Sequence, residues 1–527
     1  MIVKYFSFFL ILISILGFLL FAKFNFLIFF PFSFPYFDAL CLLDWFSLIF
    51  ISILVLISGR VLLFSKIYME HDIFSKRFTS ILVLFILRML LLIIFPFSIM
   101  FFLGWDGLGI LRFLLVNYYK AWTRWSASLK TYLIKRLGDG FFILLFAKLL
   151  LLKNLWLTDF FFIKISLIFI LGCFTKSAQI PFRTWLPAAM AAPTPVSSLV
   201  HSSTLVTAGV YLLFRFWNIY KCFFKQVLLY LSLLTAFIAS LAAAFEWDSK
   251  KIIAFSTLSN LGIMIFSLGL GLFVQGFFHL LTHAIAKAKL FVNVGYMIKK
   301  TNHHQDSRIL SKKAVSKLVC RIFSTYSVFR LSGIVFFSGF FSKEKILEKN
   351  FMLINLFVVG TFYLIIFFRL FYGFRLIYLL NFKKNQTKTI KSTLKARILR
   401  IFFLTFFRVF LGNILKVYFL NFSISVKFLK VIYYCFIFLS LILSIKLFFN
   451  WTFREIFYLQ FFNSSFWIKV FSKWGTFFFY RLDFGIFFKI ENNLYLIYNK
   501  IYSFLKNFFL KNFEILIFFV FVFYFFV

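Results

Sequence analysis

Acidic residues are scarce in this chain, which has 16 Asp and Glu against 58 Lys and Arg and a formal net charge of +42. Charged residues of both signs make up only 14% of the sequence, and 63% of the residues are hydrophobic. Soluble domains usually carry about a quarter charged residues, so this composition excludes a water-soluble protein. A basic excess is also typical of nucleic-acid-binding proteins. Here many Lys and Arg flank apolar runs, where they face lipid headgroups. We therefore expect a lipid bilayer as the partner and no nucleic acid.

Cysteine is equally sparse. The five cysteines stand far apart in the sequence, at Cys41, Cys173, Cys222, Cys320 and Cys435, and no CxxC pair occurs. Iron–sulfur clusters, haem attachment and structural zinc all require closely spaced ligands, so the sequence signals none of them. We predict that this chain holds no redox centre and no metal, and that any redox centre lies on a partner.

Apolar runs of about 20 residues recur along the chain and are long enough to span a bilayer. They are apolar on all sides and do not alternate, which excludes a closed β-barrel. We expect an all-α polytopic membrane protein of about fifteen spans. The runs lie near residues 2–22, 42–66, 78–96, 98–119, 130–152, 158–178, 194–218, 223–246, 249–271, 274–298, 319–341, 350–379, 400–420, 428–449 and 511–527.

Residues 451–510 have a different pattern. From Lys489 onward, polar residues recur at helical spacing and apolar residues fill the other face, which predicts an amphipathic helix along the membrane surface. The basic segment Lys383–Arg397 reads as a loop that faces solvent or headgroups. We expect five consecutive regions: N-terminal spans 1–96, a core 97–380, further spans 381–450, the amphipathic region 451–510 and a terminal anchor 511–527.

The segment 175–215 predicts a broken helix. It contains four of the seven prolines, and proline ends a helix near the residue that precedes it. We expect one helix to end near Ile180 and another to begin with Thr194 as its cap. Irregular backbone at membrane depth is tolerated only against protein or a water-filled cavity. The break-forming residues are Pro181, Pro187, Pro193 and Pro195.

Lys176 lies directly before this break. A buried ammonium costs about 3 kcal/mol on insertion scales, so a functional role is favoured over interfacial snorkelling. In the second helix, Ser197, His201 and Thr204 share one face and predict a polar stripe. A structural core histidine is the equally plausible reading of His201.

Asp106, in the motif LGWDGLG, is the only charge between Met89 and Ile110. A lone carboxylate in an apolar run must find a cation or take up a proton, and we expect Lys176 as its partner. Helix capping is the alternative role. Arg136 and Asp139 stand three residues apart in KRLGDGFF and predict a local ion pair.

The motif HLLTHAIAKAKLF places His279, His283 and Lys287 four residues apart along one helix face. Two histidines at this spacing can bind a metal ion, but the segment has no carboxylate or cysteine and a lysine follows one turn later. A proton-carrying row is the better interpretation, since histidine and desolvated lysine can titrate near neutral pH. Lys343 in SGFFSKEK follows an interruption with small residues, and Lys250 stands in a helix connection; both also fit ordinary loop charges.

Together these motifs resemble the antiporter-like membrane subunits of respiratory complex I. LGWDGLG, RLGDGFF, KKIIAFSTLSNLGIM, HLLTHAIAKAKLF and GFFSKEKILE stand in that family's order, over about residues 40–350. The resemblance implies two inverted five-helix repeats, each with a broken helix, and a long lateral helix near the C-terminus. It also implies a charged proton-translocation axis through the bilayer centre, made of Asp106, Asp139, Lys176, His201, Lys250, His279, His283, Lys287 and Lys343.

The resemblance further implies the mitochondrial inner membrane, with the other complex I subunits as partners and cardiolipin as a candidate lipid. NADH, FMN, iron–sulfur clusters and ubiquinone would be bound by partner subunits. The amphipathic stretch and the terminal span favour the branch called chain 5 over its sisters, chains 2 and 4. Departures from the family are Asp at 106 in place of Glu, Ala188 in place of Asp, and the extra cations Arg112 and Lys289.

Two other functions remain open from sequence alone. A subunit of a multi-subunit sodium/proton antiporter shares these motifs and has no redox partner. A purely structural membrane scaffold, in which the buried charges only stabilise the fold, belongs to a different class.

Overall fold

A computed structural model describes residues 28–34, 37–95, 99–151, 163–217, 222–301, 304–308, 310, 318–333, 338–351 and 356–381, with a few isolated positions. The chain divides into two compact units, Met1–Phe457 and Tyr458–Val527, and all described residues belong to the first. The predicted regions beyond residue 381, including the amphipathic stretch and the terminal anchor, lie outside the described residues apart from two isolated positions.

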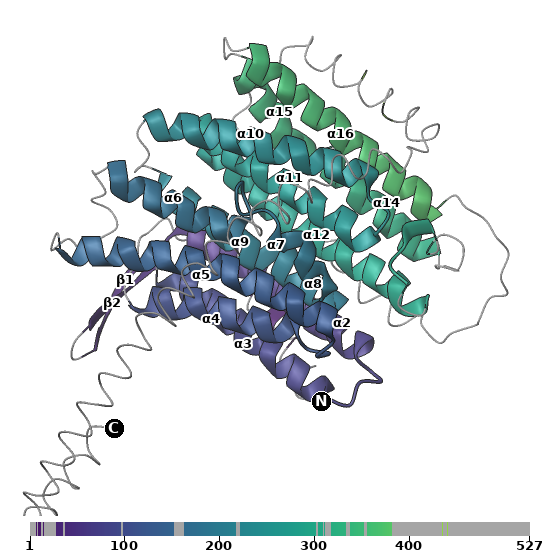
Figure 1. The fold of residues 1–527 in the computed structure, drawn as a ribbon, viewed down its shortest axis with the longest axis horizontal. Helices are drawn as coiled ribbons and strands as arrows, with labels where there is room; N and C mark the ends of the chain where they lie inside the picture. The colour runs from purple at the N-terminus through teal and green to yellow at the C-terminus, as the bar shows by residue number, and fades with distance from the viewer. Residues whose placement is uncertain are drawn as a thin grey trace, which may run out of the picture. The chain divides into compact units, whose positions relative to one another are not determined.

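The described part is built from helices with one short hairpin (Figure 1). Six helical stretches of these residues are long and apolar enough to cross a membrane, and a shorter apolar helix covers Ser166–Ser177. The main helices are α2 Trp45–Tyr68, α3 Ser75–Ile94, α4 Ile99–Val116, α5 Trp122–Leu151, α6 Ile163–Ser177, α9 Leu205–Arg215, α10 Cys222–Phe245, α11 Ser249–Gly269, α12 Phe273–Lys300, α14 Leu318–Ser332, α15 Ser338–Phe351 and α16 Leu356–Asn381.

These bounds agree with the predicted apolar runs to within a few residues in most cases. The predicted span 249–271, for example, is helix α11. The run 319–341 was predicted as one span with an interruption of small residues at 332–339, and the helix breaks at that interruption. Helix α14 ends at Ser332, Gly333 has a φ of 86°, and α15 begins at Ser338. A positive φ is a conformation that glycine adopts without strain, so Gly333 ends the helix there.

The all-α expectation has one exception. Strands β1 Ile28–Phe34 and β2 Phe37–Leu43 form an antiparallel hairpin in which Ile28 pairs with Leu43 and Phe34 with Phe37. The sequence was interpreted as apolar runs, and alternating apolar and polar residues were considered only as a sign of a β-barrel. This short hairpin before α2 was therefore not predicted.

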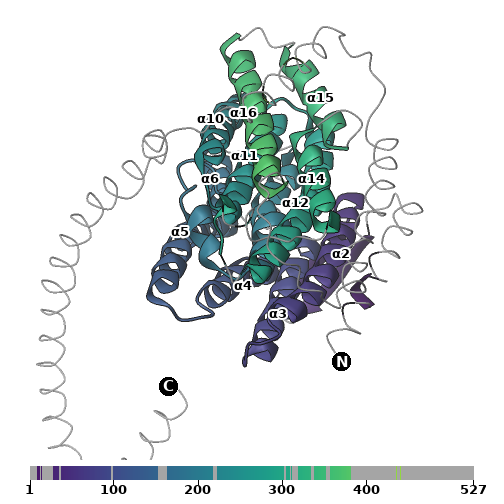
Figure 2. The ribbon, with the colours of Figure 1, turned by 90° about the vertical axis from the view of Figure 1, so that its right-hand side faces the viewer.

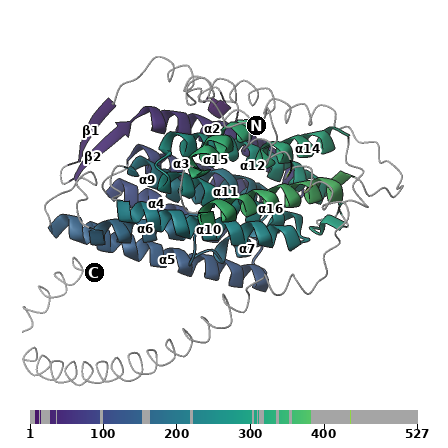
Figure 3. The same ribbon diagram turned by 90° about the horizontal axis from the view of Figure 1, so that it is seen from above.

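Neighbouring helices in the sequence also pack side by side. Helix α3 packs on α4, α4 on α5, and α5 on α6, whereas α10 packs on α11 and α16 (Figure 2). Helix α12 contacts α11, α14 and α15 (Figure 3). It also reaches back to α2 and α8. Helix α12 therefore joins the N-terminal helices to the C-terminal ones.

The predicted break after α6 is confirmed. Helix α6 ends at Ser177, and Ala178 has a φ of 56°, a left-handed conformation that costs a non-glycine residue free energy. The link continues through α7 Trp185–Ala188 and the 3₁₀ turn η2 Ala189–Ala191 to α8 Thr194–Leu199. Pro193 occupies the cap position, so Thr194 is the first helical residue and not the predicted cap.

A π-helical turn, η3 Val200–Thr204, separates α8 from α9. The Thr204 hydroxyl donates to the carbonyl of Leu199, five residues earlier, at 2.9 Å. The predicted stripe of Ser197, His201 and Thr204 assumed a continuous α-helix, and the wider turn changes the angular spacing of these side chains. Single π turns inside helices are frequent at functional sites.

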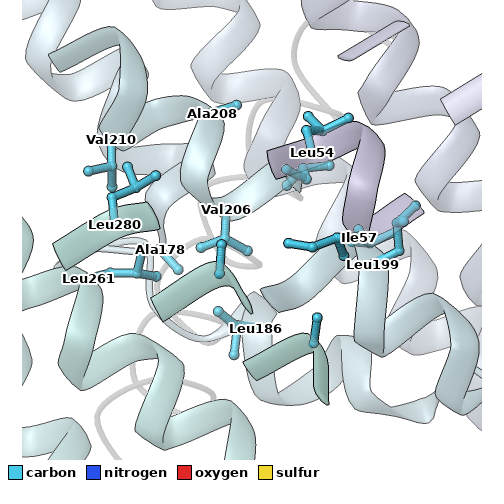
Figure 4. Close-up of a cluster of buried hydrophobic side chains, with 14 of the residues drawn as sticks. Leu54, Ile57, Ala178, Leu186, Leu199, Val206, Ala208, Val210, Leu261 and Leu280 are labelled. Carbon is cyan, nitrogen blue, oxygen red and sulfur yellow. The ribbon is translucent and has the colours of Figure 1, made fainter. Parts of the chain in front are cut away.

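The break lies inside the hydrophobic core. Side chains of α2, α7, α8, α9, α11 and α12 converge around it, among them Leu54, Leu186, Val206, Leu261 and Leu280 (Figure 4). Each of these five side chains is 1% exposed or less. The irregular backbone is therefore packed against protein, as membrane depth requires.

Candidate functional site

The N-terminal half of the site begins with an ion pair between α4 and α5. Asp106 on α4 pairs with Arg136 on α5 at 2.8 Å, and Arg136 also lies 3.6 Å from Asp139. The local pair of Arg136 and Asp139 was predicted, and so was a cation for Asp106. The predicted cation, Lys176, forms no ion pair with Asp106 within the described residues.

Lys176 is 1% exposed and rests on Trp105, the residue before Asp106. Its ammonium donates to the Trp105 carbonyl at 2.6 Å and lies 3.4 Å from the centre of the indole ring. The same indole donates its Nε1 hydrogen to the Asp139 carboxylate at 2.8 Å. Trp105 thus connects Lys176 to Asp139, through its backbone carbonyl and ring face on one side and its indole N–H on the other. Asp106 stands at the edge of this group.

Trp185 of the broken helix anchors a second group of cations. Its indole donates to the Thr175 carbonyl at 2.7 Å. The Arg112 guanidinium lies 3.8 Å and the Lys135 ammonium 5.0 Å from its ring centre, and the His201 ring centre is 6.5 Å away. Arg112 and Lys135 are both buried and make no hydrogen bond within the described residues. The sequence assigned no role to Arg112. The one sequence feature that pointed to its burial was its position inside an apolar run.

Lys250 connects the break to the second half of the site. It is 4% exposed in the first turn of α11 and donates to the carbonyl of Ala192, just before Pro193, at 3.2 Å. Its neighbour Lys251 fits the description of an ordinary loop charge better. Lys251 pairs with Asp248 at 2.8 Å at the partly exposed start of the helix.

The predicted histidine row lies on one buried helix, α12. His279 contacts the Ser342 hydroxyl at 2.9 Å through Nδ1 and the Asn260 side-chain oxygen at 3.4 Å through Nε2. Its ring centre lies 6.5 Å from that of His283. His279 therefore bridges α11, α12 and α15, and each of its ring nitrogens has a polar partner.

Lys287 and Lys343 complete the site. Lys287 donates to the Ile253 carbonyl at 3.1 Å and to the Ser256 hydroxyl, and Lys343 donates to the carbonyl of Leu331 at the end of α14. The four predicted lysines thus share one feature, since each donates to a backbone carbonyl and none pairs with a carboxylate in the part of the chain described. The lysines are Lys176, Lys250, Lys287 and Lys343.

Sequence reasoning missed buried arginines of the C-terminal half, among them Arg330 on α14 and Arg369 on α16. Arg369 on α16 is 2% exposed, makes no hydrogen bond among the described residues, and lies within electrostatic reach of His279, Lys287 and Lys343. The sequence feature that could have identified Arg369 is the occurrence of an arginine inside an apolar run. Lys289, which the sequence also left unplaced, lies 4.2 Å from the ring centre of Phe323.

No group of three or more metal-ligating side chains occurs among the described residues. The absence of a metal site stays a prediction for the whole chain.

Comparisons with known proteins identify the family to which the chain belongs. Residues 98–369 match the family described as NADH:quinone oxidoreductase/Mrp antiporter, transmembrane. The chain is 41% identical to NADH-ubiquinone oxidoreductase chain 5 of Anopheles gambiae over 71% of this chain and 67% of that protein. It is 45% identical to the chain 5 sequence of Anopheles arabiensis over 58% of this chain and 82% of that sequence.

The chain belongs to the chain 5 family of NADH-ubiquinone oxidoreductase. The family predicted from the sequence motifs is therefore confirmed. The chain matches between about half and two thirds of the length of several chain 5 relatives, for example 58% of that of Lumbricus terrestris at 45% identity.

Two solved structures of other membrane complexes share the fold of this chain. The Mrp complex from Dietzia sp. matches with a TM-score of 0.71 at 20% identity, over 83% of this chain and 53% of that chain. The membrane-bound sulfane sulfur reductase, an archaeal respiratory membrane complex, also gives 0.71, at 19% identity over 84% of this chain and 92% of that chain. At these identities the likeness concerns the fold alone.

Proposed function

We propose that this chain is a proton-translocating membrane subunit of complex I, acting in the mitochondrial inner membrane and driven by electron transfer from NADH to ubiquinone. The observation that carries the proposal is the series of buried ionisable side chains in the region that matches the family, from Asp139 on α5 to Lys343 on α15, with the partly exposed Asp106 at its start. Such residues are expensive inside a membrane and mark ion pathways.

The geometry supports a relay in two halves. In the first half, Arg136 holds Asp106 while Trp105 links Asp139 to Lys176, so a proton gained or lost at one carboxylate changes the field at the lysine. The proton would pass along the break to Lys250, which holds the Ala192 carbonyl. In the second half, Lys287, His279 and Lys343 would carry it onward. The uncharged serine and carbonyl partners leave each lysine free to change its charge.

The finer architecture belongs to the same proposal. We infer two inverted five-helix repeats, with one break between α6 and α8 and a second at Gly333, between α14 and α15. Each break stands beside a lysine, Lys176 at the end of α6 and Lys343 in the first turns of α15. Paired interruptions in corresponding halves are the usual pointer to a transport site.

Redox chemistry enters this proposal only through partners. Electron transfer would take place on other complex I subunits that bind NADH, FMN, iron–sulfur clusters and ubiquinone. This chain's own residues would hold and move protons, and the amphipathic helix predicted at 451–510 would brace neighbouring subunits.

A substitution at Lys176 tests the function. Lys176→Ala in complex I of an organism whose chain 5 gene can be edited should lower proton pumping several-fold while the complex still assembles. Reduction of ubiquinone by NADH and the pH gradient across sealed vesicles are measured on the same preparation. Lys76→Ala, at an exposed lysine in the first turn of α3, is the matched control. Unchanged pumping in the Lys176 variant would refute the proposed axis and favour a scaffold.

The fold shared with the Mrp complex keeps a sodium/proton antiporter subunit as the second candidate. Pumping that follows the sodium gradient and persists without NADH would favour that candidate. Pumping that needs NADH and ignores sodium would favour the complex I function.

A further inference from the structure

A pocket of about 510 Å³ lies outside the buried site, between the loop that follows α2 and the loop that follows α4. The hydroxyl of Tyr119 in the second loop donates to the carboxylate of Asp72 in the first at 2.9 Å. Burial, together with the Asp72 carboxylate, raises the pKa of Tyr119, so this hydroxyl stays a donor. The two loops are thereby held together around the pocket.

The position of the first loop shows where the pocket lies relative to the membrane. Helices α2 and α3 are both candidate membrane spans, so the residues that connect them lie at a membrane surface. Trp122 and Trp125 stack near the second loop at 5.5 Å and are 78% and 41% exposed. Exposed tryptophans are enriched where lipid headgroups meet water. The pocket therefore opens at headgroup level.

The lining contains the cations Arg77 and Lys120 together with hydrogen-bonding groups, of which the Tyr118 hydroxyl can donate and the Asn117 amide oxygen only accepts. His71, Arg77 and Lys120 line the pocket and are exposed, while the carboxylate of Asp72 already accepts the Tyr119 hydrogen bond. Buried polar atoms of two further lining residues, the Tyr118 hydroxyl and the Asn117 amide oxygen, have no hydrogen-bond partner within the described residues. Arginine, lysine and a free hydroxyl together suit a phosphate group.

An apolar surface continues from the same pocket. Ile81 of α3 and Leu114 of α4 line it, and Leu84, Leu87 and Ile110 lie exposed further along these two packed helices. A soluble phosphate would leave this surface unused. A molecule with a phosphate and long acyl chains would fill both parts.

We propose that this pocket binds an anionic phospholipid, with its phosphate between Arg77 and Lys120 and its acyl chains along α3 and α4. Neither residue belongs to the buried site, so lipid binding here is independent of proton transfer. Basic residues near a membrane surface each strengthen the binding of anionic lipid about fivefold.

Native mass spectrometry of the full chain in detergent, titrated with phosphatidic acid, tests the proposal. The double variant Arg77→Gln, Lys120→Gln should weaken the tightest lipid binding about thirtyfold, from two such contributions. The control Lys76→Gln removes an exposed cation of α3 that does not line the pocket, and it should leave binding unchanged. Equal binding by the double variant and the wild type would overturn the proposal.

Two further experiments distinguish lipid binding from the binding of free phosphate and from misfolding of the variant. Inorganic phosphate, added in excess, should not displace the lipid; full displacement would assign the pocket to free phosphate and overturn the lipid assignment. Should the double variant fail to fold, the unmodified chain is treated with a photoreactive phosphatidic acid. Cross-links at Ile81 or Leu114 would support the proposal, and cross-links found only elsewhere would contradict it.

Discussion

At the residue scale, the buried lysines divide into two kinds. Four of them donate a hydrogen bond to a backbone carbonyl: Lys176, Lys250, Lys287 and Lys343. Lys135 is equally buried and makes no hydrogen bond within the described residues. Its contacts are the Trp185 ring at 5.0 Å and the fields of Arg112, Lys176 and Asp139. A buried donor without an acceptor costs free energy that an apolar side chain of similar size does not.

Lys135→Met should therefore raise the free energy of unfolding by about 1–3 kcal/mol, because it removes an unsatisfied buried donor. The melting temperature of the detergent-solubilised chain would report the change. Lys130→Met, at a half-buried lysine of the same helix, is the control and should change stability by no more than about 0.5 kcal/mol. A marked loss of stability in Lys135→Met would show that the ammonium has a partner essential to the fold.

At the scale of elements, the site depends on how closely α5 and α6 approach. A Cβ atom added at Gly138 would lie 2.0 Å from the Thr175 hydroxyl oxygen, and Gly138 and Thr175 adjoin Asp139 and Lys176. The short distance between the two helices lets the Asp139 carboxylate and the Lys176 ammonium both contact Trp105. Glycine at 138 is thus required for helix packing and not for backbone freedom.

Gly138→Ala should destabilise the chain by about 1–3 kcal/mol through overpacking and should also lower pumping, because α6 must move away from α5. Gly140→Ala on the same helix is a sharp control, since nothing lies within 4 Å of its added Cβ. It should stabilise the helix by up to about 1 kcal/mol. Thermal unfolding of both variants tests this, and the double change Gly138→Ala, Thr175→Ala should restore part of the loss. Equal melting temperatures for the two single variants would contradict it.

Much of this element scale follows from sequence, because helix length and proline position are local properties. Apolar runs located α2 to α12 closely, and the prolines located the break. The partner of Asp106 was missed because a sequence does not show which of two nearby cations, Arg136 or Lys176, points toward it. The π turn at Val200–Thr204 has no sequence signal that we recognised. The position of Arg369 within electrostatic reach of Lys343 arises only from the packing of α16.

At the scale of the whole molecule, the proposed role requires a larger assembly. A native gel of mitochondrial membranes, stained for NADH dehydrogenase activity, should contain peptides of this chain in the active high-mass band. Their presence only in a separate inactive band would refute membership of complex I and make ion-flux assays the next step.

The carbonyl acceptors of the four lysines give the molecule an internal spectroscopic reporter. A cationic donor draws electron density from the C=O bond and lowers its stretching frequency, and a neutral amine does so less. Loss of the Lys176 proton should therefore shift the amide I absorption of Trp105 upward, and loss of the Lys250 proton should do the same at Ala192. Carbon-13 placed in the carbonyls of tryptophan or of alanine would separate the two signals. Time-resolved infrared difference spectra could then show in which order the lysines change charge.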